Sequence, residues 1–508
     1  MRQGLDPSRL SPLAFAALYA AFFALAAVPV LRAGMLPLVD YPNHLARMQL
    51  LASLPHDATL QRFYALAWRP IPDLAMDVIV PVLLSVMPLA AAGKLFVLLV
   101  FLVLTGGAAM LHRVVCGRWS AWPLLAFLVV YNRLLLWGML NYLFGLGLAF
   151  LALAGAVALS RRGAAVRLAA GTAFAFLVFF AHLAAFGVYA VLWLGHEAGA
   201  VRRRWQGLGA AAPRLAVAAG PLLLPLAVML LAGTSGGGGV GFGQPWRKLD
   251  LLFSVFDLYH RPFDVACFVL AVAGLGYLFA CRFLAFAPAL LLPAALLGLA
   301  YLVMPTDLLG ATGADRRLPL ALALVLCAAT VWAGPRPRLE RAVLAAAAAM
   351  FLLRLGTVAA SWQASDREYH TLLAGLDRIP RGSRVAVAFP PAAINVSATP
   401  LVHFAVLAAA RRDAFVPTLF ARPSQQPIVM QPAYRALAAA TASDRLWDAF
   451  VVGAPPLDAA DRATLARYDY IVFAGVRPFV LADRGGLVPV FQAPRFAVFR
   501  LAPARVGG

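Results

Sequence analysis

Long runs of apolar residues, separated by short polar segments, are the main pattern of this sequence. Because a helix needs about 20 apolar residues to cross the hydrocarbon layer of a membrane, such runs predict membrane spans. We expect eleven of them, at residues 12–32, 95–111, 120–137, 139–159, 168–181, 183–197, 211–232, 263–281, 283–304, 318–333 and 342–360. The apolar segment 74–89 is shorter and contains Pro81 and Pro88, so we expect a helix that lies in the membrane or dips into it. The predicted fold class is mainly α, a polytopic transmembrane helical bundle.

The composition agrees with this class. Hydrophobic residues make up 63% of the 508 residues and charged residues only 13%, whereas soluble proteins average roughly 45–50% and about 25%. The composition therefore argues against a soluble enzyme. The net charge of +21 is large, and a charge of this size also suggests a nucleic-acid-binding protein.

The distribution of the charge gives a different explanation. If the N-terminus lies in the cytoplasm, the inner segments hold fifteen arginines and three acidic residues, which is a net +12. The outer segments then carry +3, and the chain from Ser361 onward carries +6. An excess of arginine on the cytoplasmic side is the usual signature of membrane topology. We therefore expect no nucleic-acid partner. The prediction is a multi-pass protein of the bacterial cytoplasmic (inner) membrane, in contact with membrane lipids, with its N-terminus inside.

Residues from Ser361 onward have the composition of a soluble domain. Their apolar pattern predicts strands at 384–389 and 470–473, a helix at 458–467, and a hairpin-like pair of strands at 487–492 and 495–501. We therefore divide the chain into a transmembrane domain, 1–360, and a small extracytoplasmic α/β domain, 361–508. No catalytic motif marks the second domain, so we expect a structural or acceptor-binding role for it.

The acidic residues of the transmembrane domain have the opposite bias to its arginines. Nine of twelve fall on the outer face, mostly in three long loops at 33–94, 233–262 and 305–317. The cytoplasmic loops are short and chemically plain. An active site would therefore face outward.

The first outer loop begins with residue types suited to acid–base chemistry beside a phosphate. Pro42 and Asn43 are typical of a helix start, and a helix from there places His44 and Arg47 on one polar face. Asp40 lies just before this helix. One interpretation is a capped helix on the membrane surface with ordinary surface charges. The other is a site that pairs a carboxylate base with cationic phosphate binders.

Charged residues at the outer ends of later spans are further candidates. Asp315, Arg316 and Arg317 immediately precede a span and suit a lipid phosphate, since arginine offers a fork of donors. Plain anchoring to lipid headgroups is the alternative. Lys94, one of only two lysines, opens the second span, where anchoring at the interface competes with phosphate binding.

Polar residues within or between the spans complete the candidate set. Ionisable groups at membrane depth cost free energy, so Asp77 and Arg354 are candidates for a cavity, with a local ion pair as the alternative. Arg133 and Asn141 lie at the turn between the third and fourth spans. His182 lies where two short spans meet, and such a histidine is more often a packing residue than a ligand.

These features resemble the GT-C superfamily of integral-membrane glycosyltransferases. The resemblance rests on the first span, the outer loop with its Asp and helices, about a dozen spans and the outer α/β domain. Its motif is Leu36-Pro-Leu-Val-Asp40-Tyr-Pro-Asn-His44-Leu-Ala-Arg47. It implies transfer of a sugar from a polyprenyl-phosphate or polyprenyl-diphosphate carrier to an acceptor, with inversion at the anomeric carbon. In this reading Asp40 is the general base, and the donor phosphate is bound by His44, Arg47, Lys94, Arg316 and Arg317.

Metal dependence stays open in this resemblance. Many members of the family carry an acidic pair in this loop, whereas Tyr41 and Pro42 follow Asp40 here. The resemblance leaves a divalent metal ion as a candidate cofactor, but the missing acidic pair argues against metal dependence.

Other classes of function compete with the enzyme. A membrane transporter or lipid flippase would also bury charges among its helices, but no internal repeat of the kind many transporters have is visible. A transporter also gains little from a long outer tail. A membrane acyltransferase with His44 as base, and a non-catalytic envelope assembly subunit, are further alternatives.

Overall fold

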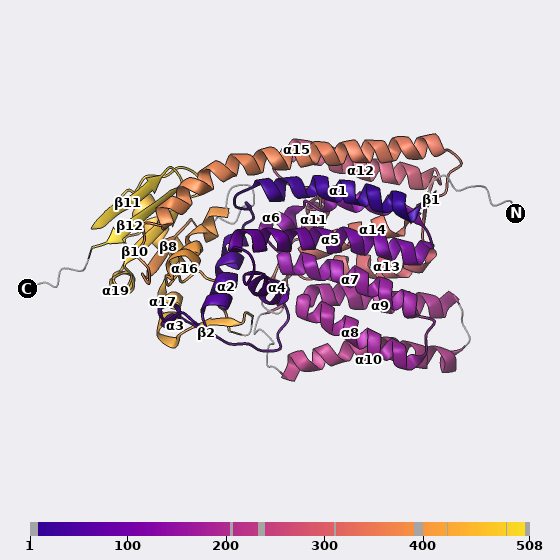
Figure 1. Ribbon diagram of the computed structural model, residues 1–508, viewed down its shortest axis with the longest axis horizontal. Helices are drawn as coiled ribbons and strands as arrows, with labels where there is room; N and C mark the ends of the chain where they lie inside the picture. Colours follow the sequence, from indigo (N-terminus) through magenta and orange to yellow (C-terminus); the bar gives the residue numbers. More distant parts are fainter. Residues whose placement is uncertain are drawn as a thin grey trace, which may run out of the picture.

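The computed structural model describes residues 9–203, 207–231, 239–308, 311–390, 400–423, 425–483 and 485–502. Its long helices run roughly parallel to one another in a bundle, and a small sheet lies at one end of this bundle (Figure 1). The mainly α class predicted from the sequence is confirmed.

Each of the eleven predicted spans contains at least one helical segment. Among the described residues, eight helices are long and apolar enough to cross a membrane. They are α1 (Pro12–Arg32), α5 (Leu89–Cys116), α7 (Leu140–Leu159), α8 (Ala164–Ala181), α9 (Leu183–Arg203), α10 (Leu208–Leu231), α12 (Arg261–Ala280) and α15 (Pro337–Leu376). The helices α8 and α9 meet at His182, whose backbone is extended, as the sequence predicted.

The predicted span 120–137 consists of two short helices. The first, η1 (Trp122–Val129), is a 3-10 helix, and the second is α6 (Arg133–Trp137). A 3-10 helix rises about 2.0 Å per residue against about 1.5 Å for an α-helix, so η1 covers more depth with fewer residues. Asn132 separates the two, because its side-chain oxygen accepts hydrogen bonds from the first N–H groups of α6. Gly138 then ends α6 with a left-handed backbone.

The predicted spans 283–304 and 318–333 contain shorter helices than expected. These are α13 (Pro288–Val303) and α14 (Leu318–Ala329). The strand β4 (Leu284–Phe286) precedes α13, β7 (Thr330–Trp332) follows α14, and the two strands pair antiparallel. A strand rises about 3.3 Å per residue, so three extended residues replace about twice as many helical ones.

The first outer loop folds into α2 (Tyr41–Ser53), α3 (Ala58–Gln61), β2 (Tyr64–Leu66) and α4 (Ala75–Leu83). The helix α4 lies within the segment 74–89 that was predicted as a short helix. The helix α2 packs against α4 and α5, and also against two segments from the C-terminal region. His44 and Arg47 are consequently only 8% and 3% exposed. The interpretation of α2 as a surface helix with its polar face in water is therefore wrong, because neighbouring elements cover it.

The C-terminal region contains a four-stranded sheet in the order β11, β12, β10, β8. The strands β8 (Val385–Ala388) and β10 (Tyr470–Ala474) are parallel, while β11 (Leu487–Ala493) and β12 (Phe496–Leu501) form an antiparallel hairpin beside β10. These strands confirm the predicted ones, and α19 (Ala459–Leu465) confirms the predicted helix. Further helical segments of this region are η3 (Pro400–Val406), α16 (Leu407–Arg412), α17 (Pro432–Ala440), α18 (Ser443–Trp447) and η4 (Asp448–Val452).

Two connections hold the C-terminal region against the helical bundle. The helix α15 continues without a break past residue 360, the predicted domain division, and contacts β11 and β12 (Figure 1). The strand β9 (Ile428–Met430) pairs antiparallel with β2 of the first outer loop. In addition, α2 packs against η3 and α16. The division at residue 360 stays a prediction, and the C-terminal region lies directly over the loop that contains Asp40.

Short elements join the long helices. They are β1 (Arg9–Leu10), β3 (Trp119–Ser120), α11 (Arg247–Phe253), β5 (Asp307–Leu308), β6 (Ala311–Thr312) and η2 (Asp315–Arg317). The strands pair locally, β1 with β3 and β5 with β6.

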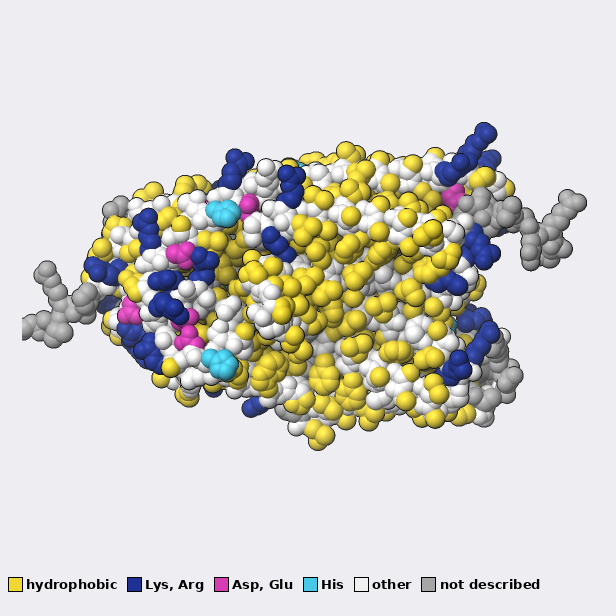
Figure 2. Space-filling model, in the orientation of Figure 1, with side chains coloured by type: hydrophobic (Ala, Val, Ile, Leu, Met, Phe, Trp, Pro, Cys, Tyr) yellow, Lys and Arg dark blue, Asp and Glu magenta, His cyan; other side chains and the backbone are white. Residues whose placement is uncertain are grey.

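Apolar side chains cover the middle of the bundle, and Lys and Arg side chains gather toward its two ends (Figure 2). Large apolar residues on the helix surfaces are exposed, such as Leu223, Leu230 and Leu270. Soluble proteins rarely expose a continuous apolar surface of this extent, whereas lipid tails cover it in a bilayer. The chain is a multi-pass membrane protein.

Candidate active site

Asp40 is the N-cap residue of α2 and lies against the turn that ends α6. Its backbone N–H donates to the carbonyl oxygen of Trp137 at 3.0 Å. A Cβ atom added to Gly138 would lie 3.0 Å from the Cβ of Asp40, and Gly138 has a φ of +85°. Glycine is therefore required there both for the left-handed backbone and for the close approach. The side chain of Asp40 is 29% exposed, so its carboxylate is accessible.

His403 from the C-terminal region faces Asp40. The distance from His403 Nε2 to Asp40 Oδ1 is 3.3 Å. The rings of His403 and Phe420 meet edge to face with centroids 5.1 Å apart. His403 was not predicted as a site residue, because the C-terminal region has no catalytic motif. Nothing in the local sequence indicates the contact, since it joins the start of α2 to the distant segment η3.

His44 is buried near Asp40, and one of its ring nitrogens already contacts a backbone carbonyl oxygen. Its Nε2 lies 3.0 Å from the carbonyl oxygen of Gly138, and its Nδ1 is buried without a hydrogen-bond partner among the described residues. Burial, together with the nearby charge of Arg47, lowers the pKa of His44 to about 4. The imidazole is therefore neutral at pH 7, and it supports the turn at Gly138.

Arg47 and Asp77 form a bidentate ion pair between α2 and α4. The Nε–Oδ1 and Nη2–Oδ2 distances are 2.7 and 2.9 Å, and the side chains are 3% and 1% exposed. This is the local ion pair given above as the alternative for Asp77. Because both donors of the fork face the carboxylate, Arg47 anchors α4 to α2 and presents no free fork to a phosphate.

Lys94 points to the end of the first span. Its Nζ donates to the carbonyl oxygen of Leu31 at 3.3 Å, in the last turn of α1. A cation at a helix C-terminus interacts favourably with the helix dipole and its unpaired carbonyl groups. This contact fits the anchoring alternative for Lys94.

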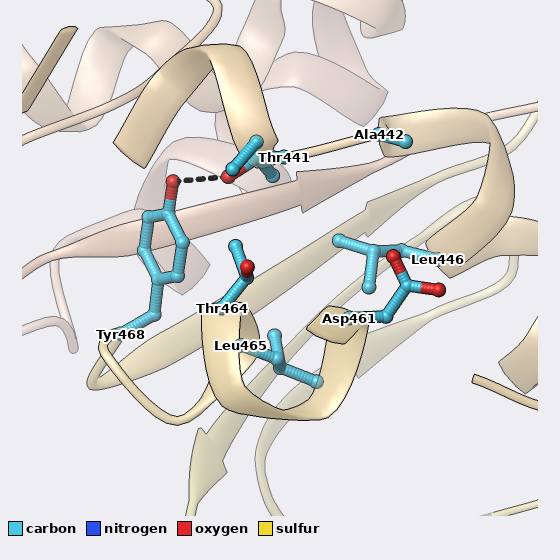
Figure 3. Close-up of a pocket in the computed structure, with 8 residues that line it drawn as sticks. Thr441, Ala442, Leu446, Asp461, Thr464, Leu465 and Tyr468 are labelled. Carbon is cyan, nitrogen blue, oxygen red and sulfur yellow. Dashed lines mark hydrogen bonds between the residues drawn. The ribbon is translucent and has the colours of Figure 1, made fainter. Parts of the chain in front are cut away.

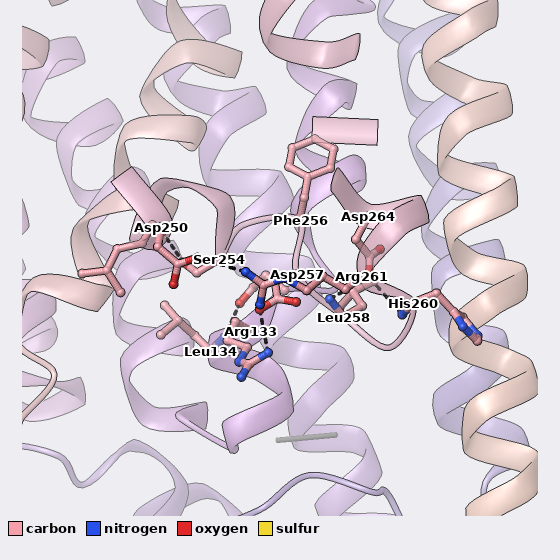
Figure 4. Close-up of polar contacts among 12 residues, drawn as sticks. Arg133, Leu134, Asp250, Ser254, Phe256, Asp257, Leu258, His260, Arg261 and Asp264 are labelled. Atoms are coloured by element: carbon pink, nitrogen blue, oxygen red, sulfur yellow. Dashed lines mark hydrogen bonds and ion pairs between the residues drawn. The ribbon is translucent and has the colours of Figure 1, made fainter. Parts of the chain in front are cut away.

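Two arginines flank the indole ring of Trp137, the residue that binds the backbone of Asp40. The guanidinium of Arg316 lies 4.7 Å from the ring centroid and that of Arg133 lies 6.0 Å from it. Arg133 also pairs with Asp257 at 2.6 Å (Figure 4). Arg316 makes no hydrogen bond or ion pair with a described residue. Burial lowers the pKa of Arg316. The charge of Asp315 raises this pKa, and the charges of Arg247 and Arg133 lower it. A half-buried cation beside like charges is a good place for an anion.

Arg317 turns away from this stack toward a second polar cluster. Its Nη1 donates to the carbonyl oxygen of Gly313 at 2.8 Å, and its own carbonyl oxygen accepts from Tyr142 at 2.5 Å. Burial is the main cause of a lowered pKa at Arg317, and the charge of Asp73 opposes it. Part of the hydrogen-bonding capacity of the Arg317 guanidinium is thus used within its own loop.

Asp73 is the carboxylate of that second cluster. Its Oδ1 lies 3.6 Å from His182 Nε2, and its carbonyl oxygen accepts from Asn141 Nδ2 at 2.5 Å. The backbone of Asp73 is left-handed, with φ of 70°, and its side chain is 44% exposed. Asp73 is one of the nine acidic residues predicted on the outer face, and it was not among the predicted site residues. Asn141 also accepts from the N–H of Met76, so it fixes the chain that leads into α4.

Arg354 and Asp315 are engaged in buried pairs. Arg354 Nη1 lies 3.1 Å from Asp264 Oδ1, and both side chains are at most 3% exposed. Asp264 also accepts from two N–H groups of the preceding loop (Figure 4). Asp315 Oδ2 lies 3.4 Å from Lys248 Nζ and accepts from Thr306, while its Oδ1 is buried without a partner among the described residues. These pairs join α15 to α12 and η2 to α11.

The described residues contain no group of three His, Cys, Asp or Glu side chains arranged to hold a metal ion. Asp257 pairs with Arg133 (Figure 4), and Asp264 pairs with Arg354. Metal dependence stays open.

A small pocket in the C-terminal region lies between α17, α18 and α19 (Figure 3). Three of its polar side chains already have partners. Tyr468 and Thr441 share a hydrogen bond of 2.7 Å, and Asp461 both pairs with Arg445 at 2.6 Å and completes the cap of α19. These contacts are structural, so the candidate site remains the one around Asp40.

The whole chain is similar in structure to ArnT from Cupriavidus metallidurans. The apo structure of ArnT superposes with a TM-score of 0.55, at 12% sequence identity, over 98% of this chain and 99% of ArnT. The structure of ArnT bound to undecaprenyl phosphate gives a TM-score of 0.53, also at 12% identity, over 98% and 100%. The chain has the ArnT-like GT-C fold. No family model and no curated protein matches the sequence. The GT-C fold inferred from the resemblance is thus confirmed.

Proposed function

We propose that this protein is an integral-membrane glycosyltransferase that takes a sugar from a polyprenyl-phosphate carrier and transfers it to an acceptor on the outer face of the membrane. The ArnT-like fold supports this proposal over its full length. ArnT is a GT-C glycosyltransferase, and one of its structures holds undecaprenyl phosphate. The same similarity favours an enzyme over the transporter or flippase alternative.

The observation that carries the proposal is that Asp40 and Arg316 both contact Trp137. The backbone of Asp40, whose carboxylate is accessible, donates to the carbonyl oxygen of this tryptophan, and the guanidinium of Arg316, unpaired among the described residues, lies against its indole ring. A base and a phosphate-binding cation are the two groups that glycosyl transfer from a phosphate carrier needs.

The reaction follows from these two groups. The hydroxyl oxygen of the acceptor forms a bond to the anomeric carbon, and its proton passes to the carboxylate of Asp40. The bond from this carbon to the phosphate oxygen breaks, and its electron pair leaves with the polyprenyl phosphate. Because the attack and the departure occur on opposite faces of the sugar, the configuration at the anomeric carbon inverts.

Arg316 is the best-placed group for the departing phosphate, because its guanidinium is half-buried and without an ion-pair partner among the described residues. Negative charge grows on the phosphate in the transition state, and a cation held in place stabilises it there. Arg133, which pairs with Asp257, also lies against the ring of Trp137, with its guanidinium 6.0 Å from the centroid.

The proposed orientation places the N-terminus in the cytoplasm and the C-terminal region outside. The arginine excess of the inner segments supports this orientation. Reporter fusions after Arg162, in the turn between α7 and α8, and after Leu376, at the end of α15, should read as cytoplasmic and extracytoplasmic respectively.

The function is tested with the purified protein in lipid nanodiscs, radiolabelled undecaprenyl-phosphate sugars as donors, and an envelope lipid extract as acceptor. We expect the wild-type protein to transfer label and Asp40→Asn to lose at least about a hundredfold in kcat while it still binds undecaprenyl phosphate. Asp444→Asn, a change at an exposed carboxylate of the C-terminal region, is the matched control and should remain active. Full activity of Asp40→Asn would exclude Asp40 as the base.

A further inference from the structure

The C-terminal region contributes a side chain to the site around Asp40, through a small set of contacts centred on Asn43. Asn43 is fully buried on α2, three residues after Asp40. It contacts three residues of the C-terminal region: Thr418, Phe420 and His403. These contacts fix both the position of the His403 ring and which of its two nitrogens is the donor.

The orientation of the Asn43 amide follows from its two backbone partners. Its Oδ1 accepts from the N–H of Phe420 at 2.7 Å, so this atom is the oxygen. Its Nδ2 donates to the carbonyl oxygen of Thr418 at 2.9 Å, so this atom is the amide nitrogen. The reverse orientation would set two donors against each other and two acceptors against each other.

The same amide nitrogen lies 3.3 Å from His403 Nδ1. Because Nδ2 of Asn43 is a donor, Nδ1 of His403 must be the acceptor and carries no proton. The remaining proton of the neutral imidazole is therefore on Nε2. This atom faces Asp40, with Nε2 and Oδ1 3.3 Å apart.

The ring of His403 is also held by packing. Phe420 meets His403 at an interplanar angle of 70° and meets His44 at 79°, so one phenyl ring fixes both imidazoles. Among the described residues, Oδ2 of Asp40 has no hydrogen-bond or ion-pair partner. The carboxylate therefore has one oxygen next to an N–H group and one oxygen free.

We propose that His403 is a positioning residue for the general base: its Nε2–H holds Oδ1 of Asp40, so that Oδ2 is directed to the acceptor hydroxyl. The inference rests on the proposed function and adds the C-terminal region to the catalytic site. The 3.3 Å contact between His403 Nε2 and Asp40 Oδ1 shortens to a hydrogen bond when the sugar carrier and the acceptor substrate occupy the site, as contacts between catalytic groups commonly do on substrate binding.

Two substitutions separate this role from a merely structural one. In His403→Gln the side-chain N–H lies near the former position of Nε2, so the donor to Asp40 is kept. In His403→Asn the shorter amide reaches only to the position of Nδ1, so the contact with Asn43 is kept and the donor to Asp40 is lost. Glutamine thus keeps the donor to Asp40, whereas asparagine keeps the contact with Asn43 and is smaller by one methylene group.

The experiment measures kcat, KM for the donor and the pH dependence of kcat, with the full-length protein in nanodiscs and the assay described above. We expect His403→Asn to lose roughly ten- to a hundredfold in kcat, the effect of one hydrogen bond to a charged group, with KM changed less than about twofold. The acid limb of its kcat profile should move to higher pH. His403→Gln should recover most of the rate and the profile of the wild type.

The ionisable groups that face Asp40 are His403 from η3 and His44 from α2, with the Arg47–Asp77 pair behind His44. His44 and the ion pair are unchanged in both variants, so a difference between the two pH profiles reports on His403.

The outcomes are distinct. Equal activity in His403→Asn and the wild type, or equal loss in both variants, would overturn the role of His403 while the proposed function stands. A wild-type protein that transfers no sugar from any of the labelled carriers, although it is folded by size-exclusion chromatography, would overturn the proposed function and this inference with it.

Discussion

The carbonyl oxygen of Trp137 accepts the backbone N–H of Asp40 at 3.0 Å, and the indole ring of the same residue lies 4.7 Å from the guanidinium of Arg316. One tryptophan thus sets both the backbone of the proposed base and the cation proposed for the phosphate. Its neighbours Asn132 and Gly138 fix it locally, the first by starting α6 and the second by ending it. The interruption of the predicted span 120–137 is therefore what builds the site.

Removal of the Arg316 guanidinium should weaken binding of the carrier phosphate. Because a hydrogen bond to a charged group contributes about 1.5–3 kcal/mol, Arg316→Ala should raise the Kd for undecaprenyl phosphate by about tenfold or more. Arg316→Lys keeps the charge but loses the fork and the stacking on Trp137, so it should recover only part of the affinity. Quenching of tryptophan fluorescence measures the binding. Arg161→Ala, at an exposed turn between α7 and α8, is the control and should bind as the wild type does.

Loss of one partner of the buried Arg47–Asp77 pair should destabilise the fold strongly. Loss of one partner leaves a buried charge unpaired, so Arg47→Leu should lower the free energy of unfolding by about 3–5 kcal/mol. The double variant Arg47→Leu/Asp77→Leu should recover much of this loss, since it buries no charge. Arg411 and Asp377 form an exposed pair of the same kind, and Arg411→Leu should cost less than about 1 kcal/mol. Thermal unfolding in nanodiscs checks all four proteins. Equal effects at the two pairs would contradict the burial argument.

Acid should destabilise the fold through His44. Burial lowers its pKa to about 4 in the folded protein, against about 6.5 in an unfolded chain. Between these two pH values the unfolded chain binds a proton at His44 that the folded protein does not bind. The contribution of neutral His44 to the free energy of unfolding is therefore fully present above about pH 6.5 and is lost as the pH falls toward about 4. The contribution of this one group amounts to about 3 kcal/mol at the acid end.

The variant His44→Gln isolates this effect. Glutamine keeps a donor for the carbonyl oxygen of Gly138 but does not titrate in this range. Its unfolding temperature should therefore fall less than that of the wild type between about pH 7 and about pH 4.5. The other buried histidines are common to both proteins and cancel in the comparison. Parallel pH profiles would show that His44 is already accessible to protons in the folded state.

The sequence predicted the helical framework and the strands because both depend on local apolar patterns. The meeting of two short helices near His182 and the strands predicted at 470–473 and 495–501 followed from residues adjacent in the chain. The carboxylate at Asp40 could be singled out in the same way, from its place before a helix in an outer loop. Whether His44 and Arg47 face water could not be predicted from the sequence, because an amphipathic pattern does not reveal that a distant segment covers the polar face.

Contacts between distant segments account for the remaining differences. His403 lies in a segment without any catalytic motif, and only the packing of η3 and α16 on α2 brings it to Asp40. Likewise, the sequence does not indicate that Asp77 forms an ion pair with Arg47, or Arg354 with Asp264. For each of these charges the ion-pair alternative was open until the partner could be located.

Gly138 allows a direct test of how closely the backbone of Asp40 must be placed. In Gly138→Ala the new Cβ would lie 3.0 Å from both the Cβ and the N of Asp40, in addition to the strain of a left-handed backbone. Gly117 is the matched control, since it also has a positive φ, but a Cβ added there would meet no atom within 4 Å. Both alanine variants should lose about 1–2 kcal/mol of stability from backbone strain.

Only the variant at Gly138 should displace the carboxylate. Because a small misplacement of a reacting group lowers the rate strongly, Gly138→Ala should reduce kcat by about tenfold or more, whereas Gly117→Ala should keep the wild-type kcat. The affinity for undecaprenyl phosphate should be unchanged in both, since Arg316 contacts the ring of Trp137 and not the turn that follows it. Steady-state transfer rates measured beside carrier binding distinguish the two effects. If both variants lost activity equally, the loss would come from backbone strain, and the contact between Gly138 and Asp40 would have no special role in catalysis.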